Sequence, residues 1–262
     1  MTKLKPFFSP KIWGYEKWTV SSHPHGRSLP PDYDYPLLVK IIRAEDTLSV
    51  QVHPDDDYAR IHEHSRGKTE CWYVLDAKRG ASLVCGLSGS YSAGELREAI
   101  RENRLDPYLN SVPVKKGDLV FIPAGLVHAI QGGIRLLEVQ ESSDITYRLY
   151  DWGRGREVHI EQGLEVFKNL RPQVIREFSG RFECPYFTLD TVEGEAELAS
   201  EADFAFFVFG GRGELRGVET GPAVRTTVAV KVRRNDTVFC RKAEKLFVSA
   251  GIRGMKITPR DV

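Results

Sequence analysis

Leu-Ser-Val-Gln-Val-His-Pro, residues 48–54, alternates apolar and polar side chains. Successive side chains of a β-strand point to opposite faces, so Ser49, Gln51 and His53 are expected to share one face. Leu48 and the two valines would occupy the opposite face. Because the polar face lies in an otherwise apolar run, the pattern predicts a strand that carries its polar groups into a site rather than into open solvent.

A second run, Gly-Lys-Thr-Glu-Cys-Trp-Tyr-Val-Leu at residues 67–75, has a similar pattern. Strand alternation puts Lys68, Glu70 and Trp72 on one of its faces. A third strand-like run ends in Pro-Ala-Gly-Leu-Val-His at residues 123–128. Three distant parts of the chain therefore each supply polar side chains of the kinds that bind ligands.

Together these runs contain the donor types of a metal site. His53 and His128 offer imidazole nitrogens, Glu70 offers a carboxylate and Gln51 offers an amide oxygen. This set suits a divalent metal such as zinc. A lone histidine in a β-protein is more often structural, but one metal would explain all of these polar residues at once. The sequence therefore predicts a metal site.

Composition excludes several classes of protein. The chain has 262 residues, 41% of them hydrophobic, which is enough for a substantial core. Lysine and arginine (37) nearly balance aspartate and glutamate (36), so no overall charge points to nucleic acid or a membrane surface as a partner. Residues 1–10 lack the apolar core of a signal peptide, and no apolar run could span a bilayer, so a cytoplasmic location is expected. The widely spaced cysteines favour buried free thiols.

Short strand-like runs separated by Gly, Pro and Asp clusters predict an all-β sandwich or barrel. The clearest predicted strands cover residues 36–42, 48–53, 70–75, 81–85, 118–122 and 135–139.

Helical patterns interrupt the strands at a few places. An insertion near residues 88–112 contains apolar residues at helical spacing after Ser92, which is expected to be the N-cap. Residues 160–169 predict a second short helix. Residues 55–57, all aspartate, are expected to form a turn.

The hydrophobic pattern fades after residue 152, which suggests a connection between domains. We expect a metal-binding domain at residues 1–155, a helical connection at 156–178 and a second β domain at 179–262.

The predicted second domain echoes the first without its polar residues. Residues 204–209 read as a strand that enters a tight turn at 210–213, and residues 234–239 resemble residues 116–121. No histidine occurs after His159. We therefore expect the second domain to bind no metal.

Five segments then occur in a distinctive order: Lys-Ile-Trp-Gly (11–14), Leu-Ser-Val-Gln-Val-His-Pro-Asp-Asp (48–56), Gly-Lys-Thr-Glu-Cys-Trp-Tyr (67–73), Pro-Ala-Gly-Leu-Val-His-Ala (123–129) and Ser-Asp-Ile-Thr-Tyr-Arg-Leu-Tyr-Asp (143–151). In these segments the chain resembles type I mannose-6-phosphate isomerases, in their compact bacterial form. The resemblance covers roughly the first 155 residues with specific motifs. It implies two cupin-like jelly-roll domains with short helical insertions and a metal site in the N-terminal barrel only.

The resemblance also implies roles for individual residues. The family's zinc ligands fall on Gln51, His53, Glu70 and His128. Its catalytic residues fall on Arg148, Lys68 and Asp144, and its substrate-binding residues fall on Ser49, Lys68 and Arg148. The implied reaction interconverts mannose 6-phosphate and fructose 6-phosphate by moving a proton through a cis-enediol, with one Zn²⁺ per chain.

Several alternatives stay open on the sequence alone. The base that abstracts the proton is Asp144, Lys68 or a metal-associated water. Manganese or cobalt could replace zinc. An iron or manganese oxygenase is disfavoured, because Lys68 and Arg148 would have no purpose beside an oxygen site. A sugar-binding regulator is disfavoured because no expected site residue is missing. Sugar specificity and oligomeric state are not determined.

Overall fold

A computed structural model describes residues 1–220 and 225–260. The chain divides into two compact units. The large unit contains Phe8–Lys17 and Leu38–Phe178, and the small unit contains Met1–Phe7, Trp18–Leu37 and Ser179–Val262. The domain boundaries at residues 155 and 178 stay predictions.

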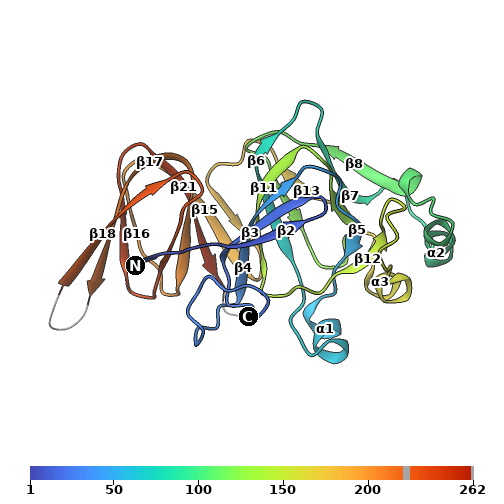
Figure 1. Ribbon diagram of the computed structural model, residues 1–262, viewed down its shortest axis with the longest axis horizontal. Helices are drawn as coiled ribbons and strands as arrows, with labels where there is room; N and C mark the ends of the chain where they lie inside the picture. The colour runs from blue at the N-terminus through green and yellow to red at the C-terminus, as the bar shows by residue number, and fades with distance from the viewer. Residues whose placement is uncertain (221–224, 261–262) are drawn as a thin grey trace. The chain divides into compact units, whose positions relative to one another are not determined.

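The large unit is built on two sheets (Figure 1). The seven-stranded sheet has the order β13 (Gln173–Ile175), β9 (Leu119–Ile122), β6 (Glu70–Ala77), β11 (Ile134–Glu141), β4 (Leu37–Ala44), β3 (Gly14–Val20) and β2 (Phe7–Lys11). The five-stranded sheet has the order β12 (Tyr147–Tyr150), β5 (Val50–Val52), β10 (His128–Ile130), β7 (Ser82–Leu87) and β8 (Leu109–Pro113). Each predicted strand overlaps an observed one, which confirms the all-β prediction.

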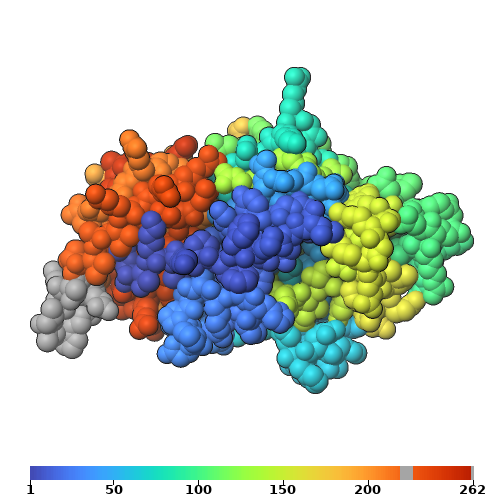
Figure 2. All heavy atoms as spheres, in the orientation of Figure 1, coloured from blue at the N-terminus to red at the C-terminus, as the bar shows by residue number. Residues whose placement is uncertain are grey.

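Short helices lie at the outside of the large unit, as the space-filling view shows (Figure 2). They are α1 (Asp56–His62), α2 (Ala93–Arg101), the 3₁₀ helix η1 (Asp106–Tyr108) and α3 (Ile160–Val166). The predicted N-cap of α2 is confirmed, since Ser92 and Glu95 form a reciprocal capping box. The turn expected at residues 55–57 is wrong. Asp55 caps α1 by accepting a hydrogen bond from the Tyr58 backbone N–H, so the acidic run starts a helix instead.

Two apolar clusters hold the large unit together. The inner cluster combines residues of both sheets, among them Trp72, Ile122 and Leu83, so the two sheets pack face to face. The outer cluster lies between the five-stranded sheet and the helices, and it includes Leu96 of α2 and Leu164 of α3. The inner space between the sheets is therefore where residues of β5, β6 and β10 can meet.

The small unit is built around a nine-stranded sheet. Its strands are β1 (Thr2–Lys3), β14 (Arg181–Glu183), β15 (Phe187–Glu193), β16 (Ala196–Leu198), β17 (Phe204–Thr220), β18 (Arg225–Arg233), β19 (Thr237–Cys240), β20 (Lys245–Val248) and β21 (Ile252–Pro259).

The tight turn expected after residue 209 is wrong. The strand continues as β17 to Thr220, with a register shift against β21 between Val208 and Gly210. Gly211 takes the left-handed conformation (φ +79°), and a Cβ there would lie 1.8 Å from the Gly251 carbonyl oxygen. The register shift is a bulge at Phe209, next to the glycines, and the strand continues past it to Thr220.

All four cysteines are buried and free. Within residues 1–220 and 225–260, no helix has the length and apolar character needed to cross a membrane.

Candidate metal centre

Strand β5 places three predicted site residues next to one another. Gln51 lies directly opposite His128 of β10 on one side and directly opposite Arg148 of β12 on the other. Residues that face each other across antiparallel strands project their side chains from the same face of the sheet. The sequence suggested that His128 ends a strand. In the structure it is the first residue of β10.

The predicted alternation of faces holds only in part. Val50 and Val52 belong to the outer cluster beneath the helices, which leaves Gln51 to the inner face. Leu48 was expected to share the face of the valines, but it belongs to the inner cluster with Trp72. The regular strand begins only at Val50, so strand alternation does not govern Leu48. Ser49 is buried immediately before this strand.

A glycine brings Lys68 to the end of β5. A Cβ on Gly67 would lie 2.6 Å from the backbone of Asp55, so only glycine permits this approach. The Gly67 N–H donates to Oδ1 of Asp56 (2.8 Å), and the Lys68 N–H donates to the Pro54 carbonyl (3.0 Å). The chain after α1 is thereby fixed against the residues that follow His53.

The ligand atoms of three predicted metal-binding residues converge inside the large unit. Nε2 of His128 lies 3.3 Å from Oε1 of Glu70, and Nε2 of His53 lies 3.7 Å from Oε2 of the same carboxylate. One ligand atom from each residue lies within 4.8 Å of the other two. Both Glu70 oxygens and Nε2 of His128 are buried without a hydrogen-bond partner. Buried polar atoms are normally satisfied, so this group fits a metal ion.

Burial favours the neutral form of both histidines, and a hydrogen bond fixes the tautomer of one of them, His128. Nδ1 of His128 lies 2.8 Å from the Leu126 carbonyl oxygen, which can only accept, so Nδ1 carries the proton and Nε2 keeps its lone pair. Burial lowers the pKa of His128 to about 4. Burial, followed by the charge of Lys68, lowers the pKa of His53 well below its usual value. Burial raises the pKa of Glu70, while the nearby Lys68 charge opposes that shift.

Lys68 is a buried lysine whose amino group lies among these side chains. Its Nζ lies 2.9 Å from Nε2 of His53 and 3.2 Å from Oε2 of Glu70. Lys68 and Glu70 are therefore close neighbours, although β6 begins only at Glu70 and Lys68 lies just outside the strand. Trp72, two residues after Glu70, places its ring 5.4 Å from the His128 ring.

Sequence reasoning missed a second buried network beside the first. Lys40 donates to Oε1 of Glu138 (3.0 Å) and to Oε1 of Gln140 (2.7 Å), and Trp72 donates to Oε2 of Glu138 (2.9 Å). Burial opposes ionisation of Glu138, but the Lys40 charge holds its pKa below the usual value. The available signal was a charged residue inside each of two apolar strands, β4 and β11.

Arg148 lies in β12 with its guanidinium held by backbone. Its Nη1 donates to the Glu157 carbonyl (2.6 Å), while Nε is buried without a hydrogen-bond partner. Burial, and then the charge of Arg156, lowers the pKa of Arg148. Asp144 is exposed in the loop between β11 and β12, and the structure does not bring it into the His53, Glu70 and His128 group.

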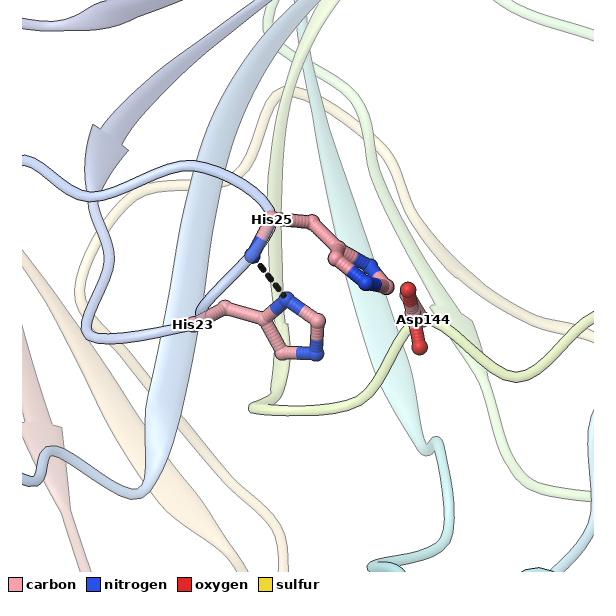
Figure 3. Close-up of side chains that lie close together, drawn as sticks. All are labelled: His23, His25 and Asp144. Atoms are coloured by element: carbon pink, nitrogen blue, oxygen red, sulfur yellow. Dashed lines mark hydrogen bonds between the residues drawn. The ribbon is translucent and has the colours of Figure 1, made fainter.

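Histidines also occur in a loop of the small unit. The His25 N–H donates to Nδ1 of His23 (3.3 Å), and the two rings meet edge to face (Figure 3). Asp144, also drawn in Figure 3, belongs to the large unit.

The comparisons with known proteins agree on one group. No protein-family model matches the chain. Over 187 residues the chain is 42% identical to a mannose-6-phosphate isomerase of Streptococcus mutans, a match covering 60% of this chain and 59% of that relative, which is less than two thirds of the relative's length. Over 260 residues it is 33% identical to a mannose-6-phosphate isomerase of Bacillus subtilis, covering 77% of this chain and 82% of the relative.

Solved structures show the same fold. The mannose 6-phosphate isomerase from Bacillus subtilis has a TM-score of 0.78 at 24% identity, over 97% of this chain and 98% of its own. A mannose 6-phosphate isomerase solved with zinc and yttrium bound has a TM-score of 0.67 at 13% identity, over 99% of both chains. Fold and site together define an all-β, cupin-like protein with a candidate His/Glu/His metal centre. By its similarity to the Bacillus subtilis relative, the chain belongs to the mannose-6-phosphate isomerase family.

Proposed function

We propose that the chain is a metal-dependent isomerase that interconverts D-mannose 6-phosphate and D-fructose 6-phosphate by proton transfer through a cis-enediol. Membership of the family supports this choice of substrate. The observation that carries the proposal is the group of buried ligand atoms on Glu70, His128 and His53, among which Nε2 of His128 and Oε1 of Glu70 have no hydrogen-bond partner.

The metal ligands in this proposal are Gln51, His53, Glu70 and His128, which would hold one zinc ion. Their nitrogen and oxygen donors suit zinc, with manganese and cobalt as alternatives. The zinc-bound relative of the same fold supports zinc. When bound, a divalent cation polarises a carbonyl and stabilises negative charge on an enediolate oxygen.

The buried charges around the centre also favour an anionic substrate. Lys40 and Lys68 are balanced by Glu70 and Glu138, all of them buried. A divalent cation added to this balanced set leaves a surplus of positive charge. In a low-dielectric interior, that surplus attracts a phosphorylated sugar and its enediolate more strongly than it would in water.

We assign substrate binding to Ser49, Lys68 and Arg148, and catalysis to Lys68, Arg148 and Asp144. The buried Nε of Arg148 is a donor available to a phosphate or enediolate oxygen. The base is one of Asp144, Lys68 or a metal-associated water. The burial of Lys68 among the metal ligands supports an action close to the reacting carbons, whereas the exposed Asp144 would act only from the surrounding loop.

A coupled assay with mannose 6-phosphate tests the proposal. Turnover is measured on the purified protein, after treatment with a chelator and after return of zinc, with metal content determined on each sample. We expect activity to disappear with the metal and to return with it. A zinc-loaded sample that turns over neither mannose 6-phosphate nor another aldose phosphate would contradict the proposal.

A further inference from the structure

The guanidinium of Arg148 depends on one short segment for its position. Its Nη1 donates to the Glu157 carbonyl at 2.6 Å. The Arg148 N–H donates to Nδ1 of His159 (3.1 Å), and the His159 N–H donates back to the Arg148 carbonyl (2.7 Å). Residues 157–159 therefore hold both the backbone and the side chain of this arginine.

That segment is preceded by a loop with no regular structure of its own. Residues 151–159 contain neither strand nor helix. Trp152, Gly153 and Gly155 have positive φ values of 55°, 73° and 75°. The Arg154 N–H donates to the Asp151 carbonyl (3.0 Å), and side-chain contacts add to this backbone hydrogen bond in fixing the shape of the loop.

Asp151 supplies those contacts. Its buried carboxylate accepts from Nη2 of Arg154 through Oδ1 (3.0 Å) and from Nε of Arg156 through Oδ2 (2.9 Å). Arg156 adds a second bond through Nη2, which makes this contact bidentate. One carboxylate thus links both arginines of the loop.

The same loop is attached to the residues immediately before β5. Nη1 of Arg154 donates to the Thr47 carbonyl (2.7 Å), and Nε1 of Trp152 donates to the Leu48 carbonyl (2.7 Å). Strand β5 carries Gln51, which lies opposite Arg148. Asp151 therefore stands between the loop that holds Arg148 and the strand that carries a predicted metal ligand.

Asp151 also compensates charge. Arg148, Arg154 and Arg156 lie close enough to influence one another, and Asp151 is the side-chain carboxylate that hydrogen-bonds two of them. Without that carboxylate, the arginines repel each other, and the loop loses the hydrogen bonds of Arg156 to Asp151 and one of the hydrogen bonds of Arg154.

We propose that Asp151 is a positioning residue for Arg148: by fixing Arg154 and Arg156 it sets the loop whose Glu157 carbonyl aims the Arg148 guanidinium at the metal-site face of β5. This inference rests on the proposed isomerase function. Asp151 acts on Arg148 through the loop and has no direct role in binding substrate.

The test is a double-mutant cycle on kcat/KM for mannose 6-phosphate. Asp151→Asn keeps the shape of the side chain and removes its charge. We expect kcat/KM to fall roughly 100-fold with unchanged metal content, because a small displacement of a positioned group costs about that factor. In an Arg148→Ala background the same change should cost less than about twofold, because the residue on which it acts is absent.

Asp118→Asn is the matched control. Asp118 is also buried and also pairs with an arginine, Arg176, at 2.6 Å, but neither residue touches the loop or Arg148. We expect this variant to lower the thermal midpoint while kcat/KM stays within about twofold of the parent. If Asp151→Asn fails to fold, Arg156→Lys, which keeps the charge but loses the bidentate contact, replaces it in the cycle.

The possible outcomes separate the two proposals. An equal loss from Asp151→Asn in the parent and in the Arg148→Ala background would overturn the positioning role. So would a loss no larger than that of Asp118→Asn. If the parent protein shows no turnover at all, the isomerase proposal fails by itself. The positioning role is then tested by calorimetric binding of inorganic phosphate, which Asp151→Asn should weaken only when Arg148 is present.

Discussion

The large and small units are both built of β-sheets, but their interiors differ in character. In the large unit the buried side chains include seven acidic or basic residues besides two histidines: Lys40, Lys68, Glu70, Asp118, Glu138, Glu141 and Asp151. Of the described residues of the small unit, Glu244 alone is a buried acidic or basic side chain. Phenylalanine and aliphatic residues such as Phe206, Val238 and Ile252 fill its core. A β framework therefore tolerates a polar interior only where hydrogen bonds, ion pairs or a ligand satisfy it.

The two units also share a turn. In the large unit the Lys115 N–H donates to Oδ2 of Asp118 (3.0 Å), and in the small unit the Arg233 N–H donates to Oδ2 of Asp236 (2.9 Å). The sequence similarity between residues 116–121 and 234–239 thus corresponds to the same local structure. The difference between the units lies in their interior side chains, not in their turns.

The largest expected effect comes from removing a histidine of the polar interior. His128→Ala should lose the bound metal, and turnover should fall by a factor on the order of 10⁴. Metal analysis and the coupled assay on one sample measure both losses. The control is His62→Ala, since His62 is exposed on α1 and should keep metal and activity. Full activity of metal-free His128→Ala protein would show that the polar interior of the large unit is not needed to hold a catalytic metal.

A cavity in the apolar interior should affect stability alone. Phe206 is fully buried in the small unit, so Phe206→Ala should lower the free energy of unfolding by about 3–5 kcal/mol. Chemical denaturation gives this value. We expect kcat of the folded fraction to match that of the parent. A large drop in kcat at unchanged metal content would mean that the two interiors are not functionally separate.

Arg148→Ala should separate catalysis from metal binding within the large unit. We expect about a hundredfold loss of kcat/KM, the usual consequence of removing one donor to a developing negative charge. Metal content should stay at the parent level, because no predicted ligand is changed. Normal turnover would show that our role for Arg148 is wrong, and loss of metal would show that the arginine supports the centre itself.

The smallest predicted effect concerns the stability of the polar interior. Burial raises the pKa of Glu141 to about 8, above the value of about 4.3 expected for the unfolded chain. A raised carboxyl pKa means that the folded state holds its proton more tightly, so the parent loses stability as pH rises from about 4 to 8.

Glu141→Gln removes this pH dependence and keeps an oxygen that can accept the Thr69 N–H. At pH 8 the variant should be more stable than the parent by about 2 kcal/mol, and the difference should shrink toward pH 5. Unfolding curves at several pH values give the comparison. A variant that is less stable at every pH would mean that the Glu141 carboxylate is stabilising when ionised.

Much of the fold could be predicted because local patterns decide it. The helix after Ser92 and the strand that contains Gln51 follow from periodicity and capping over a few residues. The errors arose where a pattern has two local solutions. Asp55 suits a turn or a helix N-cap, and the glycines at 210 and 211 suit a turn or a bulge. Tertiary packing selects between such solutions.

Some features of the site also follow from local sequence patterns, whereas others depend on tertiary packing. The sequence by itself determined that Ser49, Gln51 and His53 alternate with apolar residues, and that Gln51 points away from Val50 and Val52, because a strand has a fixed period of two. Only the tertiary structure decided that Lys40 pairs with Glu138 and that Asp151 links Arg154 with Arg156. These contacts join residues whose meeting depends on sheet pairing and loop conformation. The local periodicity of the sequence does not determine which buried charged residues pair with each other.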